Sequence, residues 1–156
     1  MKIGIIGVGA YSVALAKMLS KKCENIWMWT ESQARYDKYL EDGCIKDVIP
    51  RVSLPSFIKM SLNKKEVVMD ANIVIIASAA AFVGEICRDI KYAIKNDTVV
   101  CIASKGIENR SCRFLSDLAT DILNIKNIHI IKIWYIFLLS YFIIVWKCIS
   151  SFIKDI

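Results

Sequence analysis

The sequence contains few of the residues that mark metal sites, disulfide frameworks and linkers. The single histidine, His129, lies in an apolar run, and no two of the six cysteines have Cys-x-x-Cys spacing. We therefore predict neither a metal site nor a redox pair, and interpret the cysteines as small buried hydrophobic residues. The chain has only two prolines, no low-complexity segment and no signal peptide at its N-terminus, where a strand begins. These absences predict a protein of a reducing compartment, which is the cytoplasm.

The overall composition predicts about one domain with an apolar addition. A chain of 156 residues can bury a substantial core. The hydrophobic content of 56% exceeds the usual range of roughly 45–50%, and the excess lies beyond Asn127. The net charge of +6 suits anionic ligands, but the basic residues are scattered and form no basic–aromatic stripe. Nucleic acid is therefore not a predicted partner.

The first 24 residues carry the clearest functional pattern. A buried-strand run at residues 2–6 passes directly into the glycine turn of residues 7–12, and an amphipathic helix follows from about Ala10. Gly7 permits the tight turn, and Gly9 lets the backbone approach a pyrophosphate with no Cβ in between. The helix start offers N–H groups and a positive dipole end to the phosphates. Ser12 replaces the usual third glycine, a position that serves close helix–strand packing. In this context the pattern predicts a dinucleotide site.

The second strand, residues 25–29, closes a β-α-β unit of ordinary length. Glu31 follows it, about twenty residues past the glycines, where such proteins meet the adenosine ribose. A carboxylate there accepts hydrogen bonds from both ribose hydroxyls and repels a 2′-phosphate, which favours NAD over NADP. Alternatively, Glu31 only opens the next helix, where a carboxylate suits the helix dipole. Both interpretations stay open.

The rest of the chain predicts an α/β fold with a doubly wound parallel, Rossmann-like sheet. Residues 58–62 can form a third strand, residues 72–77 are the clearest fully buried, β-branched strand, and residues 98–103 form a fifth strand. Helical patterns occupy residues 32–42, 64–69, 82–94 and 111–123. Strands that alternate with helices are typical of this architecture. Ligands of such sheets bind at the carboxyl ends of the strands.

Four segments together resemble the soluble NAD(P)-dependent sn-glycerol-3-phosphate dehydrogenase family. They are the glycine turn with its aromatic Tyr11 and Ala-Leu-Ala helix, the Trp29 that ends the second strand, the loop of residues 49–55 with both prolines, and the loop of residues 104–108. They occur in the family's order and at matching separations. The resemblance covers residues 1–127, which we predict to be a dinucleotide-binding domain.

The resemblance implies a reaction and residue roles. Family members interconvert dihydroxyacetone phosphate and sn-glycerol 3-phosphate, which supplies the backbone of phospholipids. By position, Gly7, Gly9, Ala10, Tyr11 and Ser12 would surround the cofactor pyrophosphate. Glu31 would lie at the adenosine ribose, and Phe82 would be an aromatic cofactor contact. Lys105 matches a lysine that touches both cofactor and substrate, where an ammonium can polarise a carbonyl; without the resemblance it is an ordinary loop lysine. The cofactor is predicted to be NAD, with NADP as the alternative.

The chain also departs from the family pattern. Residues 78–81 read Ser-Ala-Ala-Ala in place of a polar loop near the nicotinamide, and beyond Asn127 the helical substrate domain, with its catalytic lysine and Arg-Asn phosphate contact, is absent. No catalytic residue is therefore assigned, and the chain is predicted to be a truncated, inactive form. Residues 128–156 form an aberrant apolar tail with three interpretations: a membrane anchor over residues 128–146, a sequence that follows a truncating frameshift, or a strand and apolar helix at a homodimer contact. A membrane-tethered non-catalytic nucleotide-binding module and a truncated hydroxyacid-type dehydrogenase remain as alternative functions.

Overall fold

The computed structural model describes residues 1–43, 45, 48–50, 52–104, 106–108 and 111–125. Within these described residues, strands and helices alternate from the first strand to the last helix, as the sequence predicts. The elements are β1 (Ile3–Ile6), α1 (Ala10–Leu19), β2 (Ile26–Trp29), α2 (Gln33–Asp42), β3 (Lys59–Ser61), α3 (Lys64–Val68), β4 (Ile73–Ile76), α4 (Ala80–Ile90), β5 (Val99–Ile102) and α5 (Leu115–Leu123).

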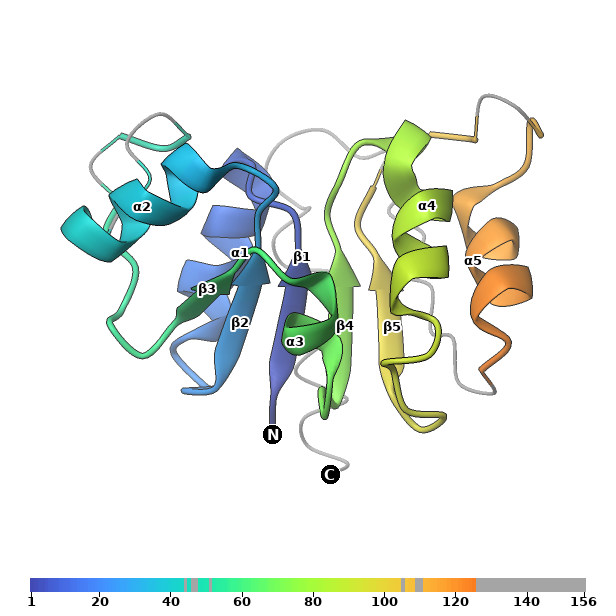
Figure 1. Cartoon of the computed structure of the whole chain (residues 1–156), viewed down its shortest axis with the longest axis horizontal. Helices are drawn as coiled ribbons and strands as arrows, with labels where there is room; N and C mark the ends of the chain where they lie inside the picture. Colours follow the sequence, from blue (N-terminus) through green and yellow to red (C-terminus); the bar gives the residue numbers. More distant parts are fainter. Residues whose placement is uncertain (44, 46–47, 51, 105, 109–110, 126–156) are drawn as a thin grey trace.

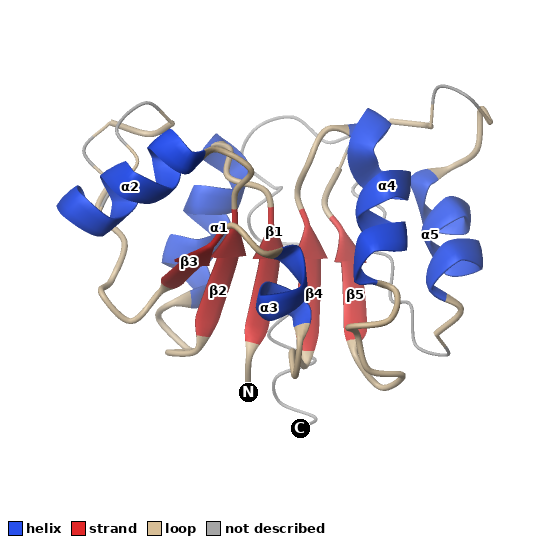
Figure 2. Cartoon of the chain, viewed as in Figure 1, coloured by secondary structure: helices blue, strands red, loops and turns tan. Residues whose placement is uncertain are grey.

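The strands form one parallel sheet in the order β3-β2-β1-β4-β5. From β1 the chain builds outwards through β2 to β3, then crosses back to the other side of β1 and continues through β4 to β5. This reversal is the defining feature of a doubly wound sheet. All arrowheads in Figure 2 lie at the same edge, so the loops that follow the strands gather there.

Helices cover both faces of the sheet, with α1 behind it and α3 and α4 in front (Figure 1). Each face of the sheet packs a hydrophobic core, and alternate residues along a strand belong to one core or the other. Ile5 and Ile75 belong to the α1 side, whereas Ile6 and Ile76 belong to the side of α3, α4 and α5. Every residue of β1, β4 and β5 is buried, which explains why these strands read as continuous apolar runs rather than alternating ones.

Local sequence signals fix several helix ends. The Ser32 hydroxyl accepts a hydrogen bond from the Arg35 N–H (3.4 Å) and begins α2, and Gly43 ends it with φ +62°. The Asn63 side chain caps α3 in the same way, accepting from the Lys65 N–H (3.0 Å). These caps lie where the sequence places a small polar residue before a helical pattern.

Two predicted helices have limits that differ from those of the structure by more than one residue. α4 begins at Ala80 rather than at residue 82 and ends at Ile90 rather than at residue 94. α5 begins at Leu115 rather than at residue 111, because the preceding segment forms a folded loop in which Ile107 pairs with Phe114 and Cys112 has φ +52°.

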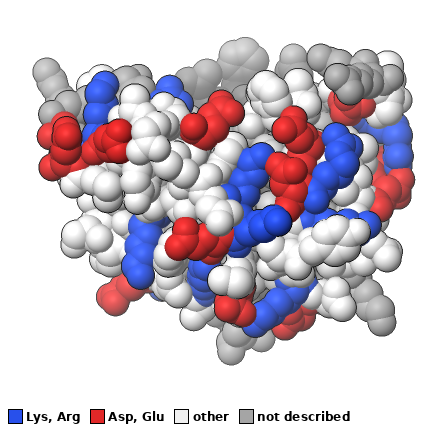
Figure 3. Space-filling model, in the orientation of Figure 1, with Lys and Arg blue, Asp and Glu red and all other residues white. Residues whose placement is uncertain are grey.

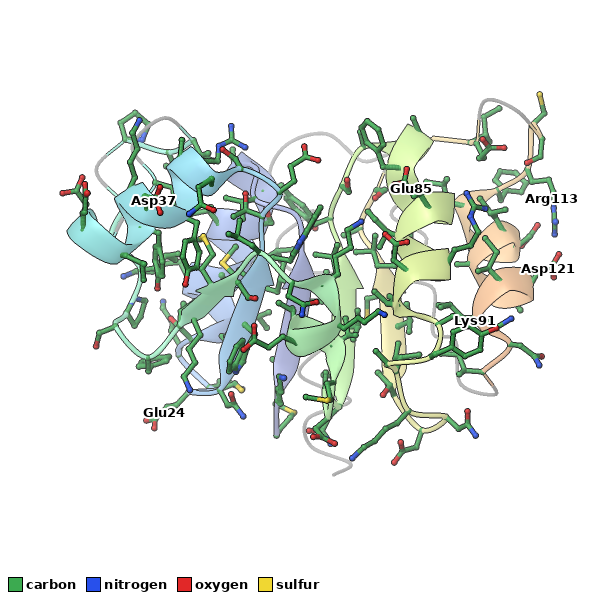
Figure 4. The ribbon with its side chains drawn as sticks, viewed as in Figure 1. Glu24, Asp37, Glu85, Lys91, Arg113 and Asp121 are labelled. Carbon is green, nitrogen blue, oxygen red and sulfur yellow. The ribbon has the colours of Figure 1, made fainter. Side chains whose placement is uncertain are left out.

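The predicted apolar tail, its boundary at residue 127 and its three interpretations lie outside the described residues. No helix within the described residues is long and apolar enough to cross a membrane. Figure 3 shows acidic and basic side chains interspersed on the visible face. In Figure 4 Arg113 and Asp121 lie side by side, in an ion pair of 2.6 Å that joins the loop before α5 to that helix.

The expectation that the cysteines are buried is confirmed for three of the four described ones. Cys23, Cys87 and Cys101 are buried and Cys112 is exposed. Burial raises the pKa of the Cys87 thiol to about 12. Cys44 and Cys148 lie outside the described residues.

Candidate functional site

The candidate site lies at the carboxyl ends of β1 and β4, the neighbouring strands between which the strand order reverses. Backbone hydrogen bonds continue the sheet one residue beyond each strand: the Gly7 N–H donates to the Trp29 carbonyl (3.1 Å), and the Ala77 N–H donates to the Ile6 carbonyl (2.9 Å). The Ala103 N–H donates to the Ile76 carbonyl in the same way (2.8 Å). The loops after β1, β2, β4 and β5 therefore leave the sheet at one level, which is where open α/β sheets bind ligands.

Gly7 turns the chain out of β1, and no other residue fits there. Its φ is +114°, and a Cβ at this position would lie 2.5 Å from the Ala77 carbonyl oxygen. The turn is thus pressed against the loop that follows β4. This contact sets the position from which α1 starts.

Gly9 is the N-cap of α1 and faces open space. Its backbone is extended (φ −121°, ψ 176°), and a Cβ there would have no atom within 4 Å. Neither strain nor crowding within the described residues therefore requires a glycine. The lack of a side chain leaves the start of α1 open to an approaching group, as a dinucleotide pyrophosphate requires.

Ser12 stabilises the glycine turn through two hydrogen bonds to Gly9. Its hydroxyl accepts a hydrogen bond from the Gly9 N–H (2.7 Å) and donates one to the Gly9 carbonyl (3.0 Å), and its side chain is 1% exposed. The sequence predicts that a small serine is tolerated at this packed position. In the structure, Ser12 also hydrogen-bonds both backbone groups of Gly9, the N-cap of α1. Ala10 and Tyr11 form the first turn of α1, with Ala10 exposed and Tyr11 half-buried against the core. All five predicted turn residues thus gather at one helix start.

The loop after β2 forms the second part of the site. Thr30 is buried, and its hydroxyl accepts a hydrogen bond from the Ser32 N–H (3.2 Å), so the link between β2 and α2 is short and fixed. Glu31 lies in this link and is exposed. Ser32, not Glu31, is the residue that caps α2.

Arg35 is a residue of this region that the sequence analysis did not select. It lies in the first turn of α2, and its Nη1 donates a hydrogen bond to the Val8 carbonyl in the glycine turn (3.2 Å). The only signal in the sequence is a basic residue four positions after Glu31, at the start of a helix.

The remaining predicted residues belong to the β4 and β5 side. Phe82 lies in the first turn of α4 and is 55% exposed. A Cβ at Gly106 would lie 3.7 Å from the Ala80 Cβ, so the loop after β5 approaches the start of α4. The Ser104 hydroxyl donates to the Ile76 carbonyl (3.4 Å). Lys105, between these two loop residues, lies outside the described residues. Among those that are described, no group of three His, Cys, Asp or Glu side chains could hold a metal ion.

Comparison with known proteins decides the family. Residues 2–133 match the model of the NAD-dependent glycerol-3-phosphate dehydrogenase N-terminus. The chain belongs to this family. The resemblance inferred from the glycine turn, Trp29 and two loops is thereby confirmed, and the family supports a nicotinamide dinucleotide as the cofactor. The match extends six residues past the predicted boundary at residue 127.

Individual glycerol-3-phosphate dehydrogenases agree with the family match. The chain is 33% identical over 118 residues to glycerol-3-phosphate dehydrogenase [NAD(P)+] of Leptospira biflexa, covering 76% of this chain and 35% of the relative. It is 28% identical to that of Wigglesworthia glossinidia brevipalpis over 78% of this chain and 37% of the relative. The chain thus spans little more than a third of these relatives. The crystal structure of the Coxiella burnetii enzyme shares the fold, with a TM-score of 0.73 at 22% identity over 78% of this chain and 37% of that one.

Proposed function

We propose that the chain is the cofactor-binding part of an enzyme that interconverts dihydroxyacetone phosphate and sn-glycerol 3-phosphate with a nicotinamide dinucleotide. The open space at Gly9, directly before the first turn of α1, is the observation that carries this proposal. In this turn Gly7 is required by its positive φ and by the close Ala77 carbonyl, whereas neither strain nor crowding requires a glycine at Gly9. A glycine at Gly9, where α1 starts, instead fits the close approach of a phosphate.

The pyrophosphate would bind along the glycine turn. Because the Ser12 hydroxyl already binds the Gly9 N–H, the phosphates would be bound by the N–H groups that follow, beginning with that of Ala10. Helix-start N–H groups have no partner inside the helix and carry the positive end of its dipole. Ser12 would fix the direction in which these groups point.

The two ends of the cofactor would lie on opposite sides of this turn. Glu31 would accept hydrogen bonds from the adenosine ribose, since Ser32 caps α2 and leaves the Glu31 carboxylate exposed. Phe82 would contact the nicotinamide side from the start of α4. Lys105 would touch both cofactor and substrate, as the family resemblance implies. When bound, the dinucleotide supplies the hydride that reduces the substrate carbonyl.

We further propose that residues 1–127 form the dinucleotide-binding domain of a cytoplasmic protein. Dihydroxyacetone phosphate and sn-glycerol 3-phosphate are proposed as substrates of the whole enzyme on the strength of the family. The described residues supply the cofactor half of this proposal, and the candidate site ends at the loops after β4 and β5.

The test is a fluorescence titration of the full 156-residue chain with NADH in mild detergent. Saturable binding, displaced by ADP-ribose but not by free nicotinamide mononucleotide at equal concentration, is expected because most of the described residues of the proposed site would contact the ADP half. A chain that is folded by circular dichroism and shows no binding at millimolar NADH would refute the proposal.

A further inference from the structure

The back face of the sheet, which is the face toward α1, is buried on β4 and β5 as well as on β1. On these two strands it is formed by Ile73, Ile75, Val99 and Cys101, which are only 2–7% exposed. All four belong to the same core as Ile5 of β1. Burial this complete requires a layer of side chains packed against the strands.

The described helices on this face lie over the other half of the sheet. α1 connects β1 to β2 and lies behind them in Figure 1, and α2 is joined to the start of β3 by the hydrogen bond that the Tyr39 hydroxyl donates to the Ile58 carbonyl. A helix about 10–12 Å wide covers about two strands that are about 4.8 Å apart. β5 lies three strand positions from β2, which is about 14 Å. Neither helix therefore accounts for the burial of Val99 and Cys101.

The chain beyond α5 can reach this face. α5 ends at Leu123 on the front of the sheet, where Ile125 still belongs to the front core. Among the described strands β5 is the outermost on this side, so the chain can pass around it. The path from a helix layer in front to one behind is about 20 Å, and residues 126–133, when extended, span up to about 26 Å. The family match also continues to residue 133.

The segment that follows has the composition of a core element. Residues 133–146 form an apolar run bounded by Lys132 and Lys147, and Ser140 is its only residue that is neither aliphatic nor aromatic. The run is shorter than the roughly twenty apolar residues that a membrane-spanning helix needs. A short run without charges suits burial against a protein core.

We infer that the apolar run of residues 133–146 covers the back face of β4 and β5 in the same chain and completes the core there. The tail is then a part of the folded domain. This inference goes beyond the proposed function and does not depend on cofactor binding. It commits to the chain's own tail as the occupant of this face, in place of a second copy or a lipid bilayer.

The experiment labels the full chain with N-ethylmaleimide in detergent-free buffer and measures each cysteine by peptide mass spectrometry. Cys23 is the matched control for Cys101. It is also 6% exposed and belongs to the same core, but it follows α1 directly, with its N–H bound to the Leu19 carbonyl (3.0 Å). In the wild type both thiols should react at least about tenfold more slowly than the exposed Cys112.

Charges in the apolar run should uncover one thiol and not the other. In a chain that carries Leu138→Asp and Leu139→Asp together, Cys101 should react at least about tenfold faster than in the wild type, while Cys23 stays protected. Ser151→Asp adds a charge beyond the run and should change neither thiol. If Cys101 stays protected in the double variant, the inference is wrong. If that variant unfolds, so that Cys23 reacts too, Leu138→Ala with Leu139→Ala replaces it under the same criterion.

The wild type alone distinguishes the other occupants. Protection of Cys101 by the tail of its own chain is independent of protein concentration and requires no membrane. If labelling of Cys101 increases as the chain is diluted, a second copy covers the face. If Cys101 is protected only when phosphatidylcholine vesicles are added, protection requires a bilayer. Either result overturns the inference.

Discussion

Gly7 and Gly9 lie two residues apart in one turn, yet alanine should affect them in opposite ways. At Gly7 the added methyl group would lie 2.5 Å from the Ala77 carbonyl oxygen, on a backbone with φ +114°. Such strain costs about 1–3 kcal/mol, and the displaced contact between the turn and the β4 loop adds to it, so we expect a loss of roughly 3 kcal/mol. At about 2–4 °C per kcal/mol for a chain of this size, Tm should fall by about 6–12 °C.

At Gly9 the same substitution should leave stability almost unchanged. The backbone there is extended, and a Cβ would have no atom within 4 Å. Restricting the unfolded chain favours alanine by about 0.4–1 kcal/mol, and alanine is a poorer N-cap than glycine by a similar amount, so the two effects nearly cancel. The methyl group would occupy the space through which a pyrophosphate approaches, and NADH affinity should fall at least about tenfold, or about 1.4 kcal/mol.

Thermal unfolding and NADH titration of both variants test this reasoning together. Gly7→Ala should be destabilised, and Gly9→Ala should be as stable as wild type but impaired in binding. If Gly9→Ala binds NADH as the wild type does, the pyrophosphate does not cross the turn at Gly9. If Gly7→Ala unfolds at the wild-type temperature, the close contact between the turn and the β4 loop is wrong.

Three further predictions concern the cap, the thiols and turnover. Ser12→Ala removes both hydrogen bonds to Gly9 and should lower the free energy of unfolding by about 1–2 kcal/mol, measured in urea; wild-type stability would show that they contribute nothing. Iodoacetamide at pH 8 should modify the exposed Cys112 and spare Cys87, whose pKa of about 12 leaves roughly one thiolate in ten thousand; equal labelling by peptide mass spectrometry would contradict this. The 156-residue polypeptide should not oxidise NADH with dihydroxyacetone phosphate, because hydride transfer needs a positioned proton donor and a bound substrate phosphate. This polypeptide spans little more than a third of its relatives. Steady turnover would show that this sheet carries the chemistry by itself.

The glycine turn could be predicted from sequence because its geometry is local. Gly7 and Gly9 stand in a strand–turn–helix context that fixes their backbone, and the buried runs of β1, β4 and β5 leave few other arrangements. The start of α5 could not be predicted in this way. Ser111 resembles a helix cap, but its N–H binds the Glu108 carboxylate (2.7 Å) in the preceding loop, and the N-cap is Phe114, whose side chain makes no capping bond.

Arg35 shows why part of the site escapes sequence reasoning. One of its partners is the carbonyl of Val8, and a backbone carbonyl leaves no mark in the sequence. The contact depends on how α2 lies against the turn, which is set by the packing of the whole α1 face. Lys105, chosen only by resemblance, falls outside the described residues, so its role stays a prediction.

The pairing of β1 imposes an order of events on the nascent chain. Ile3 pairs with Ile26 on one side and with Ile73 on the other, so its second partner follows the first by 47 residues. At about 5–20 residues per second, synthesis of that interval takes roughly 2–9 s, during which β1 has one open edge. Until β4 closes that edge, the Ala77 carbonyl is not in place against Gly7, so cofactor cannot assist the early steps of folding and can stabilise the chain only after β4 has paired with β1.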